Sequence, residues 1–185
     1  MLKRTVDIFA AVGGLLITAP LVFLLILLVR HDSPGPGIFR QSRIGRHGAV
    51  FTCYKLRTMQ LDTPNVPSHL AAPGAVTRIG AFLRRSKLDE LPQLMNVLWG
   101  EMSLVGPRPC LPSQRELIKA RDRLGVLDIR PGMTGLAQIE GLDMSDPRRL
   151  AARDADYAKR ASLALDLQIL FRTVFAGAGQ GDVSD

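Results

Sequence analysis

The longest pattern in the sequence is a hydrophobic run over residues 8–29. These 22 residues carry no charge, and Thr18 is their only polar side chain. As a straight helix the run would reach about 33 Å, which is enough to cross the hydrocarbon core of a bilayer. The residues that follow lack the small-x-small pattern of a signal-peptide cleavage site. We therefore expect the run to remain in the mature protein as a membrane helix.

Pro20 lies near the centre of this run and predicts a bend. Its missing N–H leaves the Leu16 carbonyl without a helical donor, and its ring crowds the preceding turn. Lys3 and Arg4 flank one end of the run, and Arg30 flanks the other. Basic residues at both ends favour a helix that enters one leaflet and returns to the same face, but a proline-kinked helix that spans the bilayer is also tolerated. The pattern by itself leaves both topologies open.

Two short alternating segments follow the Pro/Gly-rich linker at residues 33–37. Ile38–Ile44 and Val50–Leu56 are typical of strands, and residues 45–48 supply glycine-rich turn chemistry between them. This arrangement predicts a β-hairpin. Residues 61–74 contain four prolines or glycines and no sustained periodicity, so we expect a mobile loop there.

Helical spacing of apolar residues returns in two short segments, residues 76–87 and residues 92–99. The second begins at Pro92, which is tolerated in the first turn of a helix. Both segments are apolar on one side and lie close to basic residues. They fit interfacial helices, with Trp99 at the depth of the lipid headgroups, or helices that pack into a soluble core.

Composition narrows the class of protein. A chain of 185 residues with 46% apolar and 22% charged residues allows one compact domain, or a small domain with a membrane element. The net charge of +7 is concentrated beside the hydrophobic run, where basic residues attract anionic lipid headgroups. No nucleic-acid-binding motif accompanies this charge, so we expect no nucleic-acid partner. Cys53 and Cys110 show neither zinc-ligand nor disulfide-framework spacing.

The stretch around Asp89 and Glu90 carries the most chemical information. Two adjacent carboxylates precede a proline-initiated helix, where they could act only as capping residues. Two rigid Pro/Gly loops further along the chain each present an arginine, Arg108 and Arg130. The planar fork of arginine suits phosphate oxygens. Further basic residues that could join them around a polyphosphate are Lys55, Arg57 and Arg84.

An ordered set of motifs resembles the monotopic phosphoglycosyl transferases of the bacterial sugar transferase superfamily, in their small catalytic-core form. The matching residues run in order from residue 3 to about residue 175. They are Lys3-Arg4-x-x-Asp7, Phe51-x-x-Tyr54-Lys55-Leu56-Arg57-Thr58-Met59, Leu88-Asp89-Glu90-Leu91-Pro92-Gln93-Leu94-x-Asn96-Val97, Gly100-Glu101-Met102-Ser103-Leu104-Val105-Gly106-Pro107-Arg108-Pro109, Arg130-Pro131-Gly132-Met133-Thr134-Gly135-Leu136-Ala137-Gln138, Asp154-x-x-Tyr157 and Leu165-Asp166.

The resemblance implies that the hydrophobic run is a re-entrant helix broken at a Ser-Pro pair. Here the pair is Ala19-Pro20, so the proline is kept and the serine hydroxyl is absent. This departure affects a stabilising hydrogen bond more than the bend itself. We expect Thr18 to bond back to a helical carbonyl instead.

The resemblance also implies a reaction. A phosphosugar moves from a UDP-sugar to polyprenol phosphate, with Mg²⁺ as cofactor and UMP as the leaving group. Asp89 is then the nucleophile that forms a covalent intermediate, and it lies at the metal, while Glu90 assists Asp89 or Mg²⁺. The expected phosphate-binding residues are Lys55, Arg84, Arg108 and Arg130.

We therefore predict a helix-rich mixed α/β, membrane-associated monotopic domain on the cytoplasmic face of a bacterial inner membrane. It comprises a re-entrant helix with flanks (residues 1–32), a catalytic domain (33–176) and a disordered tail (177–185). The catalytic domain contains the β-hairpin and interfacial amphipathic helices, and it ends in a helix over Leu163–Phe175. Membrane lipid and downstream glycosyltransferases are the further expected partners in glycoconjugate assembly. The alternative is a catalytically idle scaffold of the same fold, docked at the membrane surface.

Overall fold

The computed structural model describes residues 2–61, 63 and 74–175. The expected mobile loop at residues 61–74 and the expected tail at 177–185 lie almost entirely outside these residues. The described helices, in chain order, are α1 (Leu2–Asp32), α2 (Arg78–Ser86), α3 (Gln93–Trp99), α4 (Arg115–Arg123), α5 (Leu136–Ile139), α6 (Pro147–Arg160) and α7 (Leu163–Phe175). The described strands are β1 (Ile38–Ile44), β2 (Val50–Leu56), β3 (Ser103–Val105) and β4 (Gly132–Thr134).

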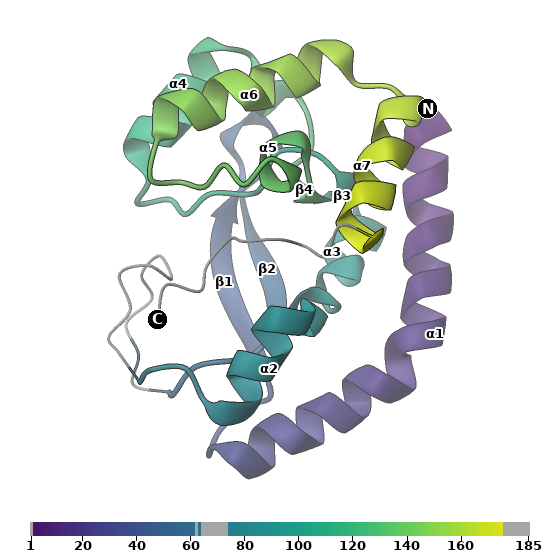
Figure 1. Ribbon diagram of the computed structural model, residues 1–185, viewed down its shortest axis with the longest axis vertical. Coiled ribbons are helices and arrows are strands. Elements are labelled where there is room, and N and C mark those ends of the chain that lie inside the picture. Colours follow the sequence, from purple (N-terminus) through teal and green to yellow (C-terminus); the bar gives the residue numbers. More distant parts are fainter. Residues whose placement is uncertain (1, 62, 64–73, 176–185) are drawn as a thin grey trace.

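Two small sheets lie among the helices, which confirms a helix-rich α/β fold (Figure 1). β1 and β2 pair antiparallel from Ile38 opposite Leu56 to Ile44 opposite Val50, so the predicted hairpin is confirmed with its predicted bounds. β3 and β4 form a parallel ladder, in which Val105 pairs with Thr134. This second sheet was not predicted from the sequence, because strands of three residues are too short to show alternation.

Helix α1 runs along one side of the molecule and bends about halfway (Figure 1). Pro20 lies inside this continuous helix, as expected for a proline bend. The Thr18 hydroxyl donates to the Gly14 carbonyl at 2.7 Å, which confirms the expected back-bond. Among the described residues, α1 is the one helix long and apolar enough to cross a membrane by length and composition.

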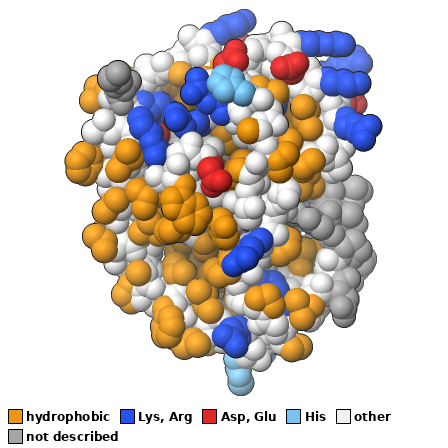
Figure 2. Space-filling view, turned by 180° about the vertical axis from the view of Figure 1, so that it is seen from behind, with side chains coloured by type: hydrophobic (Ala, Val, Ile, Leu, Met, Phe, Trp, Pro, Cys, Tyr) orange, Lys and Arg blue, Asp and Glu red, His pale blue; other side chains and the backbone are white. Residues whose placement is uncertain are grey.

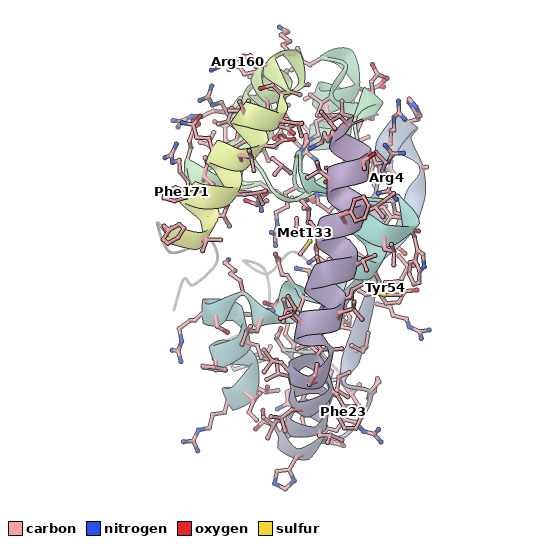
Figure 3. The ribbon with its side chains drawn as sticks, turned by 90° about the vertical axis from the view of Figure 1, so that its right-hand side faces the viewer. Arg4, Phe23, Tyr54, Met133, Arg160 and Phe171 are labelled. Atoms are coloured by element: carbon pink, nitrogen blue, oxygen red, sulfur yellow. The ribbon has the colours of Figure 1, made fainter. Side chains whose placement is uncertain are left out.

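Most of the apolar surface of α1 is not covered by protein. Only 11% of its most hydrophobic stretch is buried, and Phe9, Leu16 and Ile17 are each at least 74% exposed. Figure 2, seen from behind, shows hydrophobic side chains gathered over the left and lower parts of the molecule and basic side chains towards its upper end. In Figure 3, Phe23 lies on the lower half of α1, and Phe171 of α7 points away from α1. This distribution supports a membrane-associated protein, because large exposed apolar surfaces are unfavourable in water.

Both ends of α1 are bonded to the rest of the domain. At the start of the helix, Lys3 Nζ lies 2.5 Å from Asp166 Oδ2 of α7. Arg4 donates to the Val97 carbonyl at 2.6 Å, at the end of α3. At the other end, the Asp32 carboxylate accepts from the Ile79 N–H at 3.1 Å and so caps α2.

The guanidinium of Arg57, on the residue after β2, adds a second connection at that end. It donates to the carbonyls of Ser33 at 2.7 Å and Pro34 at 2.5 Å, which follow α1. The two ends of α1 are therefore held by one and the same protein body.

The two short amphipathic segments differ in burial. Helix α3 packs between α1 and β2 and buries Gln93, Leu94, Asn96 and Val97, so this segment is mainly a core helix. Trp99 at its end stays 56% exposed and meets Tyr54 edge to face, with ring centroids 5.6 Å apart. Helix α2 begins after Thr77, whose side chain accepts from the Gly80 N–H, and it exposes Phe82.

Candidate active site

The Asp89-Glu90 pair lies on a single 3-10 turn, Leu88–Glu90, between α2 and α3. Lys87 precedes the turn in the left-handed conformation, with φ +57°, and ends α2. This conformation is uncommon for a residue with a side chain, and it redirects the chain so that the carboxylates meet β2. The pair thus precedes α3, as predicted, but on its own turn rather than in the first turn of that helix.

Glu90 is held by two cations. Its Oε1 accepts from Lys55 Nζ at 2.9 Å and from Arg108 Nη2 at 2.8 Å. Burial alone would raise the pKa of Glu90, but Arg108 and Lys55 outweigh burial and hold the pKa far below its ordinary value. Glu90 is therefore ionised, and it joins a strand residue and a loop residue that lie 35 and 18 positions away in the chain.

Asp89 has a different environment. It is 7% exposed, and among the described residues no side chain donates a hydrogen bond to its carboxylate. Burial raises its pKa above the ordinary value; Lys55 opposes this shift, and the neighbouring Glu90 adds to it. A carboxylate that lies close to cations without being bonded to them is available to a substrate or to a metal ion.

Arg84 brings further positive charge to the pair from the last turn of α2. Its Nε donates to the Thr58 hydroxyl at 2.9 Å, which fixes the stem of the side chain. Its charge is among those that lower the pKa of Asp89. Three of the four predicted phosphate-binding residues therefore gather around the carboxylates, namely Lys55, Arg84 and Arg108.

The fourth, Arg130, points elsewhere. Its loop lies against the Arg108 loop, because the Gly132 N–H donates to the Pro107 carbonyl at 2.9 Å. A side chain at Gly106 would come within 2.5 Å of the Arg130 carbonyl, so only glycine permits this approach. The Arg130 guanidinium itself donates to the Gly100 carbonyl at 2.7 Å, beyond the end of α3. Its contact with phosphate stays a prediction.

Arg43 lies beside the site, although no motif in the sequence predicted a role for it. This residue lies on β1 opposite Phe51. Its guanidinium donates to the side-chain oxygen of Gln41 at 2.5 and 2.9 Å and to the backbone carbonyl of Pro109 at 2.8 Å. Burial and the nearby Arg108 lower its pKa to about 10. The hairpin register could have indicated Arg43. Residues two apart on a strand, and residues paired across two strands, share a face of the sheet, so Arg43 lies on the same face as Lys55.

Asn96 has a role in the structure that its place in the motif did not predict. Its Oδ1 accepts from the Tyr54 N–H at 3.2 Å, and its Nδ2 donates to the Thr52 carbonyl at 2.7 Å. The same Nδ2 bonds Glu101 Oε2 at 2.7 Å. The amide therefore replaces a neighbouring strand along the edge of β2 and fixes α3 against the strand that carries Lys55.

The late motif residues Asp154, Tyr157 and Asp166 form buried contacts away from the carboxylate pair. Asp154 pairs with Arg121 at 2.7 Å. The Tyr157 hydroxyl lies 2.7 Å from Asp166 Oδ1 and 3.1 Å from the Val105 carbonyl, and its single proton is shared between these two acceptors. Burial raises the pKa of Tyr157, so its hydroxyl stays protonated and keeps donating. These contacts join α4 to α6, and they join α6 to β3 and α7.

The carboxylate pair also bears on the binding of a divalent metal ion. Mg²⁺ is commonly held by one or two carboxylates together with substrate phosphates rather than by a complete set of protein ligands. No group of three or more His, Cys, Asp or Glu suited to a metal occurs among the described residues. The adjacent carboxylates of Asp89 and Glu90 fit such a site, because the buried Asp89 carboxylate, which accepts no hydrogen bond from a described side chain, could supply a hard oxygen ligand.

Known proteins are similar to this chain over nearly its whole length. The family described as bacterial sugar transferase matches residues 1–180. A UDP-glucose:undecaprenyl-phosphate glucose-1-phosphate transferase of Caulobacter vibrioides is 44% identical over 181 residues, which cover 93% of this chain and 68% of the relative. The exopolysaccharide production protein PSS of Rhizobium leguminosarum is 39% identical and covers 98% of this chain and 97% of its own length.

A third relative is longer than the aligned region. The undecaprenyl-phosphate galactose phosphotransferase of Salmonella typhimurium is 39% identical over 93% of this chain, which matches only 39% of the Salmonella protein. The similarity therefore covers the region that holds the carboxylate pair, the cations around it and helix α1. The chain belongs to the bacterial sugar transferase family.

Proposed function

We propose that this protein transfers a phosphosugar from a UDP-sugar to undecaprenyl phosphate and releases UMP. The observation that carries the proposal is the unequal environment of the two adjacent carboxylates. Glu90 is neutralised by Lys55 and Arg108, whereas Asp89 lies beside the same cations without a hydrogen bond from a described side chain. This arrangement suits a nucleophile next to a phosphate-binding group.

The first step forms a covalent intermediate on Asp89. A carboxylate oxygen attacks the sugar-bearing β-phosphorus, and the bond from that phosphorus to the bridging oxygen breaks. The electron pair leaves with UMP, and the phosphosugar stays on Asp89 as an acyl phosphate. Three cations lie close enough to Asp89 to lower its pKa, namely Arg108, Lys55 and Arg84. They are therefore suited to neutralise the diphosphate during transfer.

The second step regenerates the enzyme. A phosphate oxygen of undecaprenyl phosphate attacks the same phosphorus, the acyl phosphate bond breaks, and the Asp89 carboxylate leaves. The product is undecaprenyl diphosphate linked to the sugar. A bound Mg²⁺, held by Asp89 with Glu90 beside it, would supply charge neutralisation for the diphosphate oxygens.

Helix α1 supplies the membrane side of the proposal. Both of its ends bond to the same domain, at Lys3 and Arg4 on one side and at Asp32 on the other. This supports a re-entrant helix that returns to the face it entered, with the domain on the cytoplasmic side of the inner membrane. A lipid-linked acceptor and a soluble nucleotide sugar could then reach Asp89 in turn.

The proposal is tested by measuring UMP release. The full chain in lipid nanodiscs is incubated with Mg²⁺, undecaprenyl phosphate and a panel of UDP-sugars, and each reaction is repeated with excess chelator. We expect one or a few sugars to support UMP release and chelation to abolish it. A folded preparation that releases no UMP with any sugar favours the idle scaffold, and full activity in chelator contradicts the metal assignment.

A further inference from the structure

The Arg108 loop is fixed by its carbonyl groups. Its prolines, Pro107 and Pro109, have no N–H to donate, so the loop cannot use those positions to bond a neighbouring strand. Instead four consecutive carbonyls each accept a hydrogen bond of 2.8–2.9 Å. Their donors are the Gly132 N–H on Pro107, Arg121 on Arg108, Arg43 on Pro109 and the Ile44 N–H on Cys110.

Arg121 reaches the residue that pairs with Glu90. It is 2% exposed and projects from α4, where its Nη1 donates to the Arg108 carbonyl at 2.8 Å. Its Nε and Nη2 both bond Asp154 Oδ2 of α6, at 3.0 and 2.7 Å. Asp154 thus holds one edge of the guanidinium, and the remaining edge faces the backbone of Arg108.

A purely stabilising role explains this arrangement poorly. Burying an ion pair costs desolvation, and well-packed apolar residues commonly stabilise a fold as well or better. What an apolar pair cannot supply is the directed N–H at the Arg108 carbonyl. Lysine could not supply it either while bonding Asp154 in the same way, because it lacks the planar fork.

We propose that Arg121, held by Asp154, is a positioning residue that fixes the Arg108 backbone and thereby directs the Arg108 side chain at the reacting phosphate. The inference rests on the proposed function, since it assigns Arg108 to the diphosphate. Arg43 acts on the next carbonyl in the same way, from a guanidinium that is itself bonded to Gln41. Arg121 and Asp154 thus act through the Arg108 backbone and not by contact with substrate.

The first measurement compares Arg121→Lys with a matched control. Arg153→Lys alters an ion pair on α6 beside Asp154, where Arg153 bonds Glu140 at 2.6 Å and Asp156 at 3.1 Å on the outer surface. We expect kcat to fall by about 10- to 100-fold in Arg121→Lys, because small displacements of a charge-stabilising group are costly. We expect the KM for the UDP-sugar to change less than kcat, and Arg153→Lys to retain wild-type kcat.

The decisive measurement is a double-mutant cycle with Arg108→Lys. If Arg121 acts through Arg108, the Arg121→Lys change should lower kcat by no more than about twofold once Arg108 is already lysine. Equal factors in both backgrounds, or a kcat that is unchanged in Arg121→Lys, would overturn the inference. If Arg121→Lys does not fold, Asp154→Asn is used in the same cycle, since it keeps the shape of the partner and weakens its hold.

The two proposals fail in different ways. If wild type releases no UMP with any UDP-sugar, the proposed function is wrong. If wild type is active and the cycle is additive, the function stands and Arg121 is a structural residue only. Unfolding temperatures measured on all variants separate loss of folded protein from loss of turnover.

Discussion

At the scale of single residues, the pKa values of two neighbouring carboxylates are shifted in opposite directions. Glu90 is fixed between Lys55 and Arg108, and these cations hold its pKa far below the ordinary value despite burial. Asp89 is buried, and its pKa is raised. Ion pairing therefore favours the charged form of Glu90 and burial disfavours the charged form of Asp89, although the two residues are adjacent in the sequence.

The covalent intermediate proposed on Asp89 gives the first prediction. Incubation of wild type with its UDP-sugar and no lipid acceptor should add one phosphosugar mass to the protein, located by peptide mapping to residues 88–94. Asp89→Asn should show no adduct and no turnover, because it lacks the carboxylate that forms the acyl phosphate. Glu90→Gln should retain the adduct and lose about 10²- to 10⁴-fold in rate. An adduct on Asp89→Asn but not on Glu90→Gln would reverse the two roles.

The acid limb of the pH profile gives the second prediction. Asp89 must be ionised to attack, and burial raises its pKa above the ordinary 3.8. The kcat/KM of wild type should therefore fall on acidification at a pH above 3.8. In Glu90→Gln a negative neighbour is removed and two cations are left uncompensated, so both effects lower the pKa of Asp89. The limb should move to lower pH; a move to higher pH would contradict this assignment of charges.

At the scale of elements, side chains replace missing backbone partners. The Asn96 amide bonds the edge of β2 at Thr52 and Tyr54, as a third strand would. Arg57 caps the chain that follows α1, because its guanidinium donates to the Ser33 and Pro34 carbonyls. The Asn96 contacts fix α3 against the hairpin, and the Arg57 contacts fix the end of β2 against the residues that follow α1.

Removal of the Asn96 amide provides the element-scale prediction. Asn96→Ala leaves the Tyr54 N–H and the Thr52 carbonyl without this partner and should lower the free energy of unfolding by about 1–3 kcal/mol. Thermal unfolding in detergent, followed by circular dichroism, measures the change. Gln168→Ala, at an exposed position of α7, serves as the control and should stay within about 0.5 kcal/mol of wild type. Equal unfolding temperatures for the two variants would rule out this role.

At the scale of the whole molecule, α1 is joined to the domain at both of its ends. Lys3 bonds Asp166 and Arg4 bonds the end of α3, while Asp32 caps α2 at the opposite end. Most of the apolar middle of the helix is left uncovered by protein. A helix that crossed the bilayer would have to break one of these two sets of contacts.

Topology is therefore the whole-molecule prediction. Cysteines introduced at Leu2 and Ser42, both exposed, should be labelled by an impermeant maleimide in inverted membrane vesicles and not in intact spheroplasts. The native Cys53 and Cys110 are buried, so the parent chain should stay unlabelled. Pro20→Leu should straighten α1 and expose some Leu2→Cys molecules to the outside. Labelling of Leu2→Cys in spheroplasts without that change would exclude the re-entrant helix.

The sequence determined those features whose causes are local. The hydrophobic run with Pro20, the hairpin bounds and the helix over Leu163–Phe175 follow from periodicity and turn chemistry, which act over a few residues. The motifs also identified the Asp89-Glu90 pair and three of the cations now found around it. The family follows from the order of those motifs.

Only the tertiary structure decided how these pieces meet. The three-residue ladder of β3 and β4 brings two loops together, yet Arg108 turns to Glu90 while Arg130 turns to Gly100. Arg121 lies far from the carboxylates in the sequence and reaches the Arg108 loop because α4 packs on α6. Hydrogen bonds between distant segments depend on the direction of each side chain after packing, and a linear pattern of residue types does not encode that direction.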